Sequence, residues 1–544
     1  MELNPGLHLR RAAGPVLRFA GLWIALNVAL KGYAAYSQRE WLPLVQPSVE
    51  VLLAFLVLSL LWLRPGGPGK LARSSVAGAL CGLFLFETCQ IASEVILGRP
   101  FSMAADLPLA DNLVSFALDS FPTLFVVLGL LALLGILILV YFVFLRAVTG
   151  AAGFLERPSH RWAFGASVLA LFAGATLHWR HTGEKFWSFF HEHAVMDEFS
   201  AQLVPVFQDT RFQFRAHAAR RDVPPLSAVP LKGLRGRNVY LFVIESYGET
   251  AYTDERHRAE LQPQVDALEG AIRAAGFSMR SGYLLSPVHT NGSWMAESTF
   301  SCGLKVQDNR AFNDLLSSDV PCLSRHFAAA GYRTLEVRPG TRTAWPEGKA
   351  FFRFDESLFL PGLGYEGPAL DWATAPDQYS LEMTDRQYLS QWRKDKKPFF
   401  AEFVGISSHA PFAQVPQYFS DLSRIDDRGH VYQGAHVDHY LMFSSLGYVA
   451  SIKYELKTLQ DYITRRVDDG ALVLIFGDHQ PLRTVSGFGS GNGVPFHALS
   501  RDPEALLPFL TPEWTSGWIP RADAQKIPME RFLSIFLRGF GSNR

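Results

Sequence analysis

Residues 238–245 read NVYLFVIE and residues 471–479 read ALVLIFGDH, and these two stretches set the architecture. Each is an apolar run of strand length that closes on residues able to bind a metal ion or move a proton. Two further runs, RTLEV at 333–337 and PFFAEFVGI at 398–406, also end on polar residues. Strands that are apolar throughout are typical of a parallel sheet covered on both faces, with the ligand site beyond their carboxyl ends. The sequence therefore predicts one crevice that receives the polar ends of four strands.

Helical patterns alternate with these runs from about residue 237 onward. ELQPQVDALEGAIRAAG, CLSRHFAAAG and ASIKYELKTLQDYITRRVDDG each end at or near a glycine, the residue most common just past a helix C-terminus. Alternating strands and helices predict an α/β domain with a largely parallel sheet. We assign this domain to residues 237–544.

The chain before residue 180 is far more apolar, and it predicts an α-helical membrane domain at residues 1–180. An apolar helix needs roughly 20 residues to cross a bilayer. About five segments are near that length: 15–35, 48–63, 76–97, 120–145 and 162–179. The segment at 76–97 contains Glu87, Gln90 and Glu94. Carboxylates inside a membrane either face the interior of a helix bundle or serve a ligand, and we favour packing over a role in lipid handling.

Basic residues around these segments predict their orientation, because cytoplasmic loops carry the excess of Lys and Arg. The basic residues before the first span, after the second and between the fourth and fifth are Arg10, Arg11, Arg18, Arg64, Lys70, Arg73, Arg146, Arg157 and Arg161. The loop after the third span is acidic instead, with Asp106, Asp111 and Asp119. We therefore expect a cytoplasmic amino terminus, and an odd number of spans places the α/β domain outside the cytoplasm.

Residues 181–236 connect the two domains. The aromatic stretch EKFWSFFHEHAVMDEF fits a helix at the membrane interface and fits equally a helix packed on the next domain. We interpret His191 and His193 as an exposed helix face rather than a metal site. Cys302 and Cys322 both fall in the exported domain, where an oxidising compartment favours a disulfide, although spacing alone does not establish their geometry.

The polar residues at the strand ends form a candidate metal site. Glu245, Asp478 and His479 supply two carboxylates and an imidazole, a set that suits a divalent cation such as Mn²⁺ or Zn²⁺. Asn291-Gly292 predicts a turn, after which Ser293 begins a helix.

Ser293 is the candidate nucleophile. A hydroxyl at a helix amino terminus lies where backbone N–H groups favour an anion. Metal coordination would lower its pKa and make it a nucleophile toward phosphorus or sulfur. The alternative is that Ser293 serves only as the N-cap of its helix, which extends to about Cys302.

Four motifs in order carry a resemblance to a known family: VIES, a hydroxyl at the start of a helix, SSHAPF and FGDHQP. This order resembles the sulfatase-like branch of the alkaline phosphatase superfamily. Within that branch the chain resembles the membrane-anchored lipoteichoic acid synthase and phosphoglycerol transferase family, with the phosphoethanolamine transferases as relatives. The resemblance implies a sulfatase-like fold and one divalent ion, Mn²⁺ first with Zn²⁺ or Mg²⁺ as alternatives. It also implies a bacterial inner-membrane protein with a periplasmic catalytic domain.

The resemblance assigns metal and nucleophile roles to named residues. Glu245 matches the metal-binding acid, and Asp478 and His479 match the Asp-His metal pair. Ser293 matches the nucleophile, which is also a metal ligand. Members of the family usually have threonine at this position. The departure leaves three lesser candidates for the nucleophile, namely Thr290, Ser298 and Thr299.

Substrate contacts are also implied. His409 matches a histidine that contacts the headgroup or protonates the leaving group. Trp345 resembles the tryptophan of the headgroup pocket, whereas the arginine that often follows two positions later is Glu347 here. Arg338 and Arg342 are further candidates for binding phosphate oxygens.

The implied activity is a two-step transfer. Ser293 would take the phospho-headgroup from a membrane phospholipid, phosphoglycerol first or phosphoethanolamine, and a hydroxyl of an envelope glycan or glycolipid would then accept it. His409 is the expected general acid and base. Alternatives are a hydrolase, such as a phosphodiesterase or an atypical sulfatase, and a non-catalytic envelope binding protein. Ordinary sulfatase chemistry is disfavoured because Gly-Leu-Lys follows Cys302, and a net charge of zero gives no reason to expect a nucleic-acid partner.

Overall fold

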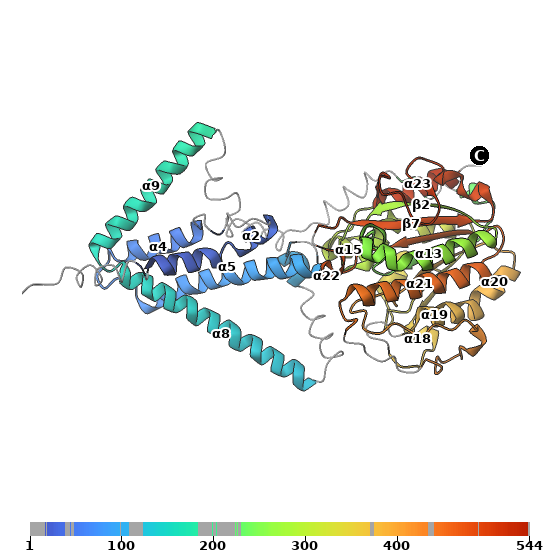
Figure 1. The fold of residues 1–544 in the computed structure, drawn as a ribbon, viewed down its shortest axis with the longest axis horizontal. Coiled ribbons are helices and arrows are strands. Elements are labelled where there is room, and N and C mark those ends of the chain that lie inside the picture. The colour runs from blue at the N-terminus through green and yellow to red at the C-terminus, as the bar shows by residue number, and fades with distance from the viewer. Residues whose placement is uncertain are drawn as a thin grey trace, which may run out of the picture. The chain divides into compact units, whose positions relative to one another are not determined.

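The computed structural model divides into two compact units, Met1–Glu94 with Pro100–Asp209 and Val95–Arg99 with Thr210–Arg544 (Figure 1). His191, His193 and most of the connecting segment lie outside the described residues. The structure describes residues 17, 19–38, 44, 48–97, 100–107, 123–182, 199, 203, 223–224, 226, 230–369, 375–432, 440–487 and 489–541.

The first unit is helical, and helices coincide with all five apolar segments. Its elements are α2 (Gly32–Gln38), α4 (Val49–Leu61), α5 (Lys70–Leu97), α6 (Met103–Asp106), α8 (Thr123–Phe154) and α9 (Pro158–Thr182), preceded by a short apolar helix at Phe19–Ala29. Within the described part of the chain, two helical stretches, Lys70–Val95 and Thr123–Phe154, are long and apolar enough to cross a membrane. Five spans therefore remain a prediction.

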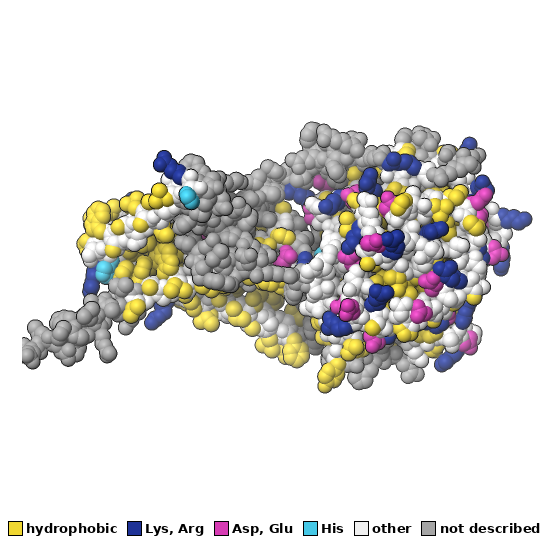
Figure 2. Space-filling model, turned by 45° about the horizontal axis from the view of Figure 1, so that its top comes forward, with side chains coloured by type: hydrophobic (Ala, Val, Ile, Leu, Met, Phe, Trp, Pro, Cys, Tyr) yellow, Lys and Arg dark blue, Asp and Glu magenta, His cyan; other side chains and the backbone are white. Residues whose placement is uncertain are grey.

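The helical unit packs around a small core and exposes apolar side chains elsewhere. Phe55 and Val148 are fully buried, and Glu87 accepts a hydrogen bond from the backbone N–H of Tyr33 at 2.9 Å, as expected for a packed carboxylate. Leu131 and Ile136 on α8 are more than half exposed. Figure 2 shows apolar side chains over this unit and scattered charges over the α/β unit. Exposed apolar surface of this extent is typical of helices that contact lipid or protein.

The second unit is an α/β domain built on a nine-stranded sheet. Its strands are β1 (Val239–Ile244), β2 (Ser278–Leu285), β3 (Arg333–Arg338), β4 (Glu356–Phe359), β5 (Phe399–Val404), β6 (Leu472–Gly477), β7 (Gly493–Ser500), β8 (Thr515–Ser516) and β9 (Ile527–Pro528). Its α-helices are α12 (Thr250–Thr253), α13 (Glu255–Ala274), α14 (Ser293–Cys302), α15 (Asn309–Leu316), α16 (Leu323–Ala329), α17 (Pro346–Phe352), α18 (Leu360–Leu363), α19 (Asp377–Thr384), α20 (Ser390–Lys394), α21 (Ser445–Arg466), α22 (Arg483–Ser486) and α23 (Phe532–Phe540).

Strand order explains how the four predicted strand ends meet. The strands follow the order β4-β3-β5-β1-β6-β7-β2-β8, with β9 beside β2. The five strands from β4 to β6 are parallel, so the predicted parallel sheet is confirmed for this half. Strand β7 pairs antiparallel with both β6 and β2. This antiparallel half is an addition that the sequence patterns did not predict.

Helices cover both faces of the sheet (Figure 1). Alternate residues of β1 belong to two different cores. Tyr240 and Phe242 pack in the core that contains residues of α13 and α21. Val239 and Leu241 pack in the core that contains residues of α14, α16 and α23. A strand buried on both faces has to be apolar at every position, which is why NVYLFVI carries no alternation.

Candidate metal centre and active site

The site begins where two neighbouring parallel strands end. Ile244 of β1 is the register partner of Gly477 of β6, so Glu245 and Asp478 leave the sheet side by side. A Cβ atom on Gly477 would lie 1.8 Å from the carbonyl oxygen of Tyr247, and only glycine permits this close approach. One ligand atom from each of Glu245, Asp478 and His479 lies within 4.8 Å of the others, and all three residues are buried.

Asp478 has one carboxylate oxygen satisfied and one that is not. Its Oδ1 accepts hydrogen bonds from the backbone N–H groups of Ser246 at 2.8 Å and His479 at 2.7 Å. Ser246 reaches this position in a left-handed backbone conformation, with φ of 57°, which is uncommon for a residue other than glycine. Asp478 Oδ2 is buried with no hydrogen-bond partner among the described residues. A buried, unpaired carboxylate oxygen is costly unless a cation meets it.

The ring of His479 is oriented by its own backbone neighbour. Its Nδ1 lies 2.8 Å from the carbonyl oxygen of Gln480, and because a carbonyl can only accept, Nδ1 carries the proton. The other ring nitrogen, Nε2, lies 3.4 Å from Asp478 Oδ2 and 3.5 Å from Glu245 Oε1. A hydrogen bond to one ring nitrogen commonly prepares the other nitrogen for a metal ion.

Ser293 completes the group from the start of α14. Asn291 and Gly292 both have positive φ, 64° and 87°, so the predicted turn is confirmed, and Gly292 occupies the N-cap position. The Ser293 hydroxyl donates to Glu245 Oε2 at 2.8 Å and lies 3.3 Å from His479 Nε2. The N-cap alternative for Ser293 is wrong, because its hydroxyl faces the carboxylates and the N-cap is the residue before it.

The lesser candidates for the nucleophile differ from Ser293 in their surroundings. Thr299 is fully buried and its hydroxyl accepts from the backbone N–H of Val306 at 2.9 Å. Ser298 and Thr290 are 1% and 4% exposed, whereas Ser293 is half-buried. Among these four residues, Ser293 is the one whose hydroxyl contacts the candidate ligands and remains open to solvent.

Burial and the repulsion between the two carboxylates shift the pKa values of the site residues. Burial, and then the neighbouring Glu245 carboxylate, raises the pKa of Asp478 to about 7. Burial lowers the pKa of His479, but the carboxylates of Asp478 and Glu245 outweigh it and the pKa is raised overall. Two carboxylates, an imidazole and a hydroxyl thus converge at a buried position that favours a positive charge. This donor set fits a divalent cation with oxygen and nitrogen ligands.

The loop that follows β5 is fastened to this centre. The Ser408 hydroxyl donates to the carbonyl oxygen of Glu245 at 2.6 Å, and His409 comes next in the chain and is half-buried. Asp377, the first residue of α19, is fully buried. Its Oδ2 accepts from the backbone N–H groups of Ile406 at 2.7 Å and Ser407 at 2.9 Å. Sequence reasoning missed Asp377, because no local motif marks a residue that acts on a loop some 30 positions away.

The residues predicted to bind substrate lie in different environments. Arg342 is exposed in the loop after β3. Trp345 is half-buried, with its ring 6.2 Å from that of Phe312. Arg338 points into the protein and pairs with three glutamates. Its geometry favours a structural role over the phosphate-binding role that the sequence predicts, since buried carboxylates occupy its donors.

Comparisons with known proteins find similarity to solved structures. No protein-family model and no curated protein matches the chain. The integral membrane lipooligosaccharide phosphoethanolamine transferase A from Neisseria meningitidis is similar at 12% identity, over 97% of this chain and 95% of that one, with a TM-score of 0.48. The lipoteichoic acid synthase LtaP from Listeria monocytogenes is similar at 14% identity, over 60% and 81%, with a TM-score of 0.38.

A third similar structure is the C-terminal periplasmic domain of EcEptC from Escherichia coli, in complex with Zn. It has 14% identity over 56% of this chain and 82% of that one, with a TM-score of 0.36. At such identities and scores these likenesses assign no residue role to this chain.

Proposed function

We propose that this chain is a membrane-anchored, metal-dependent phosphotransferase. It moves a phospholipid-derived phospho-headgroup, phosphoglycerol first and phosphoethanolamine as the alternative, to a cell-envelope glycan or glycolipid. The observation that carries the proposal is the Ser293 hydroxyl, 2.8 Å from Glu245 Oε2 and 3.3 Å from His479 Nε2 at the first residue of α14. A helix amino terminus favours the phosphate anion that such a nucleophile would attack.

Glu245, Ser293, Asp478 and His479 would hold one divalent ion, Mn²⁺ first, with Zn²⁺ or Mg²⁺ as alternatives. The unpaired Oδ2 of Asp478 supports this assignment. When bound, such an ion supplies positive charge that lowers the pKa of a hydroxyl and neutralises phosphate oxygens. Elemental analysis of the purified protein identifies the native metal.

The first step forms a bond between Ser293 Oγ and phosphorus and breaks the bond between phosphorus and the glyceride oxygen. The Ser293 hydroxyl passes its proton to Glu245, whose Oε2 accepts the hydrogen bond from Ser293 in the structure. The departing oxygen takes a proton, and diacylglycerol leaves. We assign delivery of that proton to His409, on the loop that Ser408 and Asp377 fasten to the site.

The second step reverses these movements with a different alcohol. His409 removes the proton of the acceptor hydroxyl, the acceptor oxygen bonds to phosphorus, and the bond to Ser293 Oγ breaks. Ser293 regains its proton from Glu245, and the enzyme is ready for another donor. Arg342 and Trp345 both lie between β3 and α17. We propose that Trp345 contacts the headgroup and that Arg342 contacts its phosphate.

The membrane unit would hold the catalytic domain next to the bilayer that contains the phospholipid donor. We propose about five spans within residues 1–180, a connecting segment at 181–236 and a periplasmic catalytic domain at 237–544, in the inner membrane of a bacterium. Helices at all five apolar segments support the number, and the basic loops support the orientation. A domain tethered to the bilayer meets its lipid donor at high effective concentration.

Intact-protein mass spectrometry tests the proposal. The full chain is incubated with Mn²⁺ and liposomes of phosphatidylglycerol or phosphatidylethanolamine, with Ser293→Ala and Ser298→Ala in parallel. We expect a headgroup-phosphate adduct on wild type and Ser298→Ala, none on Ser293→Ala, and at least a thousandfold lower rate of diacylglycerol release in Ser293→Ala, as for other lost nucleophiles. Absence of both adduct and diacylglycerol with either lipid would contradict the proposal.

The same experiment separates the alternatives. A hydrolase would release diacylglycerol and free headgroup phosphate at a rate that a glycan acceptor does not change. A transferase would pass the headgroup to the acceptor. A non-catalytic binding protein would bind glycan with no turnover of lipid.

A further inference from the structure

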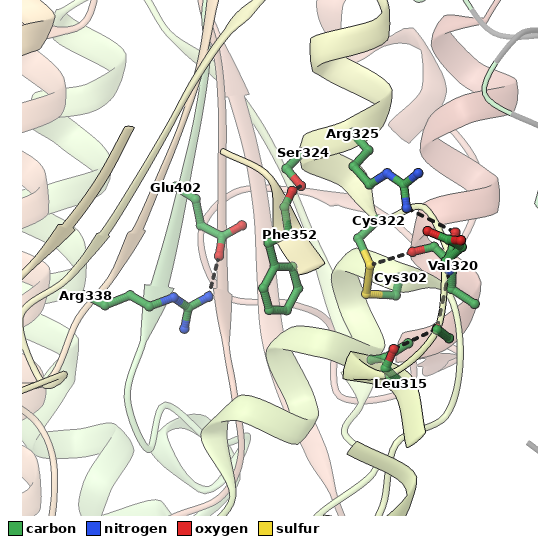
Figure 3. The surroundings of a disulfide bond; sticks show 11 residues. Cys302, Leu315, Val320, Cys322, Ser324, Arg325, Arg338, Phe352 and Glu402 are labelled. Atoms are coloured by element: carbon green, nitrogen blue, oxygen red, sulfur yellow. Dashed lines mark hydrogen bonds and ion pairs between the residues drawn. A yellow bond between two sulfur atoms is a disulfide. The ribbon is translucent and has the colours of Figure 1, made fainter. Parts of the chain in front are cut away.

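Arg338 lies at the centre of a second acidic cluster, close to the metal centre but separate from it. It is the last residue of β3, and its side chain is 10% exposed. Its Nε donates to Glu336 Oε2 at 2.9 Å, its Nη2 donates to Glu402 Oε1 at 3.0 Å, and its Nη1 donates to Glu297. Figure 3 shows the pair with Glu402. All three guanidinium nitrogens are therefore engaged by buried carboxylates.

The three glutamates belong to different elements. Glu336 lies on β3 and Glu402 on β5, so two of the contacts hold the guanidinium to the sheet. Glu297 lies on α14, four residues after Ser293 and hence one turn further along the same helix face. Arg338 thus joins the helix that carries Ser293 to β5, which neighbours β1 in the sheet, and to β3 beyond it.

The metal ligands reach the site by another route. Glu245 follows β1, and Asp478 and His479 follow β6, so their positions depend on strand pairing. Ser293 is the member of the site that depends on a helix. The far end of α14 is fixed separately by the disulfide between Cys302 and Cys322 (Figure 3).

We propose that Arg338 is a positioning residue that, through its ion pair with Glu297, fixes the first turns of α14 and holds Ser293 Oγ against the metal ligands. The role of Ser293 in this inference rests on the proposed function. A planar guanidinium suits the task, because its donors point in fixed directions and can reach two strands and a helix at once. Lysine, a single point charge, could not hold all three partners in place.

The rings around Arg338 extend the same linkage. Its guanidinium carbon lies 5.8 Å from the centroid of the Trp345 ring and 6.0 Å from that of Phe352, within the range of a cation–π contact. Phe352 appears beside the Arg338–Glu402 pair in Figure 3. Arg338 therefore contacts both Trp345, the proposed headgroup contact, and α14, the helix that carries Ser293.

The test compares two changes at Glu297 with a matched control. Glu297→Ala removes the carboxylate, whereas Glu297→Gln keeps an oxygen that can accept from Arg338. The control is Glu382→Ala on α19, because Glu382 is similarly buried and pairs with Arg386 at 2.9 Å and Arg466 at 3.0 Å. Full-length proteins with Mn²⁺ are compared by hydrogen exchange, by Mn²⁺ affinity and by the rate of adduct formation on Ser293.

We expect Glu297→Ala to raise exchange in residues 293–302 at least tenfold and to slow adduct formation at least thirtyfold. The Kd for Mn²⁺ should rise no more than fivefold, because three of the four ligands do not depend on α14. Glu297→Gln should return exchange and adduct rate to within threefold of wild type. Glu382→Ala should leave exchange in residues 293–302 unchanged relative to the rest of the domain.

Three results would overturn the inference: unchanged exchange in residues 293–302 of Glu297→Ala, equal impairment of Glu297→Gln and Glu297→Ala, or exchange raised evenly over the whole domain. Should Glu297→Ala fail to fold, Glu297→Asp replaces it, since a carboxylate one methylene shorter withdraws from Arg338 while keeping its charge. Failure of the proposed function can be distinguished from failure of this inference. If the proposed function is wrong, wild type forms no adduct, but the exchange pattern still decides whether Arg338 positions α14.

Discussion

Two buried acidic clusters in the α/β unit differ in how their negative charge is met. Around Arg338, three glutamates face a cation that belongs to the chain. At the metal centre, the ion-pair partner that Glu245 and Asp478 have among the described residues is the ring of His479. Asp478 Oδ2 has no hydrogen-bond partner among those residues. The first cluster carries its own counterion, whereas the donor set of the second fits a cation supplied from solution.

Burial raises the pKa of a carboxyl in both clusters. Burial raises the pKa of Glu402 to about 8 against the opposing effect of Arg338, so this cluster holds a proton as well as a guanidinium. Burial and the charge of Glu245 raise the pKa of Asp478 to about 7. A divalent ion would displace that proton at the metal centre, whereas the Arg338 guanidinium already pairs with the carboxylates of the other cluster.

Removing the internal cation should have the largest effect on stability. Arg338→Met leaves three buried carboxyls without a counterion, and loss of one partner from a buried ion pair costs about 3–5 kcal/mol. Urea unfolding of the full chain in detergent measures the loss. The control is Arg235→Met, because Arg235 and Glu504 are each more than half exposed and such pairs contribute about 1 kcal/mol or less. Equal losses of unfolding free energy in Arg338→Met and Arg235→Met would contradict the stabilising role of the buried cation.

The second-largest effect should come from neutralising one carboxylate in each cluster and comparing the Mn²⁺ affinities of the two variants. Asp478→Asn removes a proposed ligand and should weaken Mn²⁺ binding at least about 100-fold. Loss of a residue that only contacts a metal ligand already lowers affinity by up to about 100-fold. Glu402→Gln should change it less than about threefold, because the guanidinium already occupies that cluster. Isothermal titration calorimetry on metal-free protein supplies both values. A large loss of affinity in Glu402→Gln would mean that the two clusters bind the ion together.

The smallest effect concerns pH. Asp478 titrates near 3.8 when unfolded and about 7 in the metal-free fold, so the folded state binds the extra proton across that window and stability falls as pH rises through it. The raised pKa of His479 acts in the same direction. Metal binding must release these protons, so affinity should rise about tenfold per pH unit below 7 for each proton displaced. Titrations at pH 5, 6 and 7 test this, and a flat profile shared with Asp478→Asn would refute it.

Much of the framework around the candidate site could be predicted from local patterns. The four apolar runs became β1, β3, β5 and β6, because a strand buried on both faces leaves an unbroken apolar signal. The helix expected at Ser293 spans Ser293–Cys302, since Asn291-Gly292 fixes its start. The disulfide between Cys302 and Cys322, which the sequence left open, is present.

The antiparallel half of the sheet could not be predicted in the same way. Strand β7 contains Pro495 and His497 within a fully buried run, which weakens its strand pattern. Strand β2 carries Arg280 and Gly282. Both strands form because each finds a partner across the sheet, and long-range pairing of this kind leaves little trace in local sequence.

The sequence by itself determined the chemistry available to this protein: two carboxylates, an imidazole and a helix-capping turn before a hydroxyl, each next to a buried strand or at a helix start. Those assignments rest on local periodicity and turn chemistry, which act over a few residues. Only the tertiary structure decided which polar side chains meet. It placed Ser293 on Glu245, fastened the His409 loop through Asp377, and turned Arg338 inward to three glutamates, because pairing between distant strands and the burial of charge depend on the whole fold.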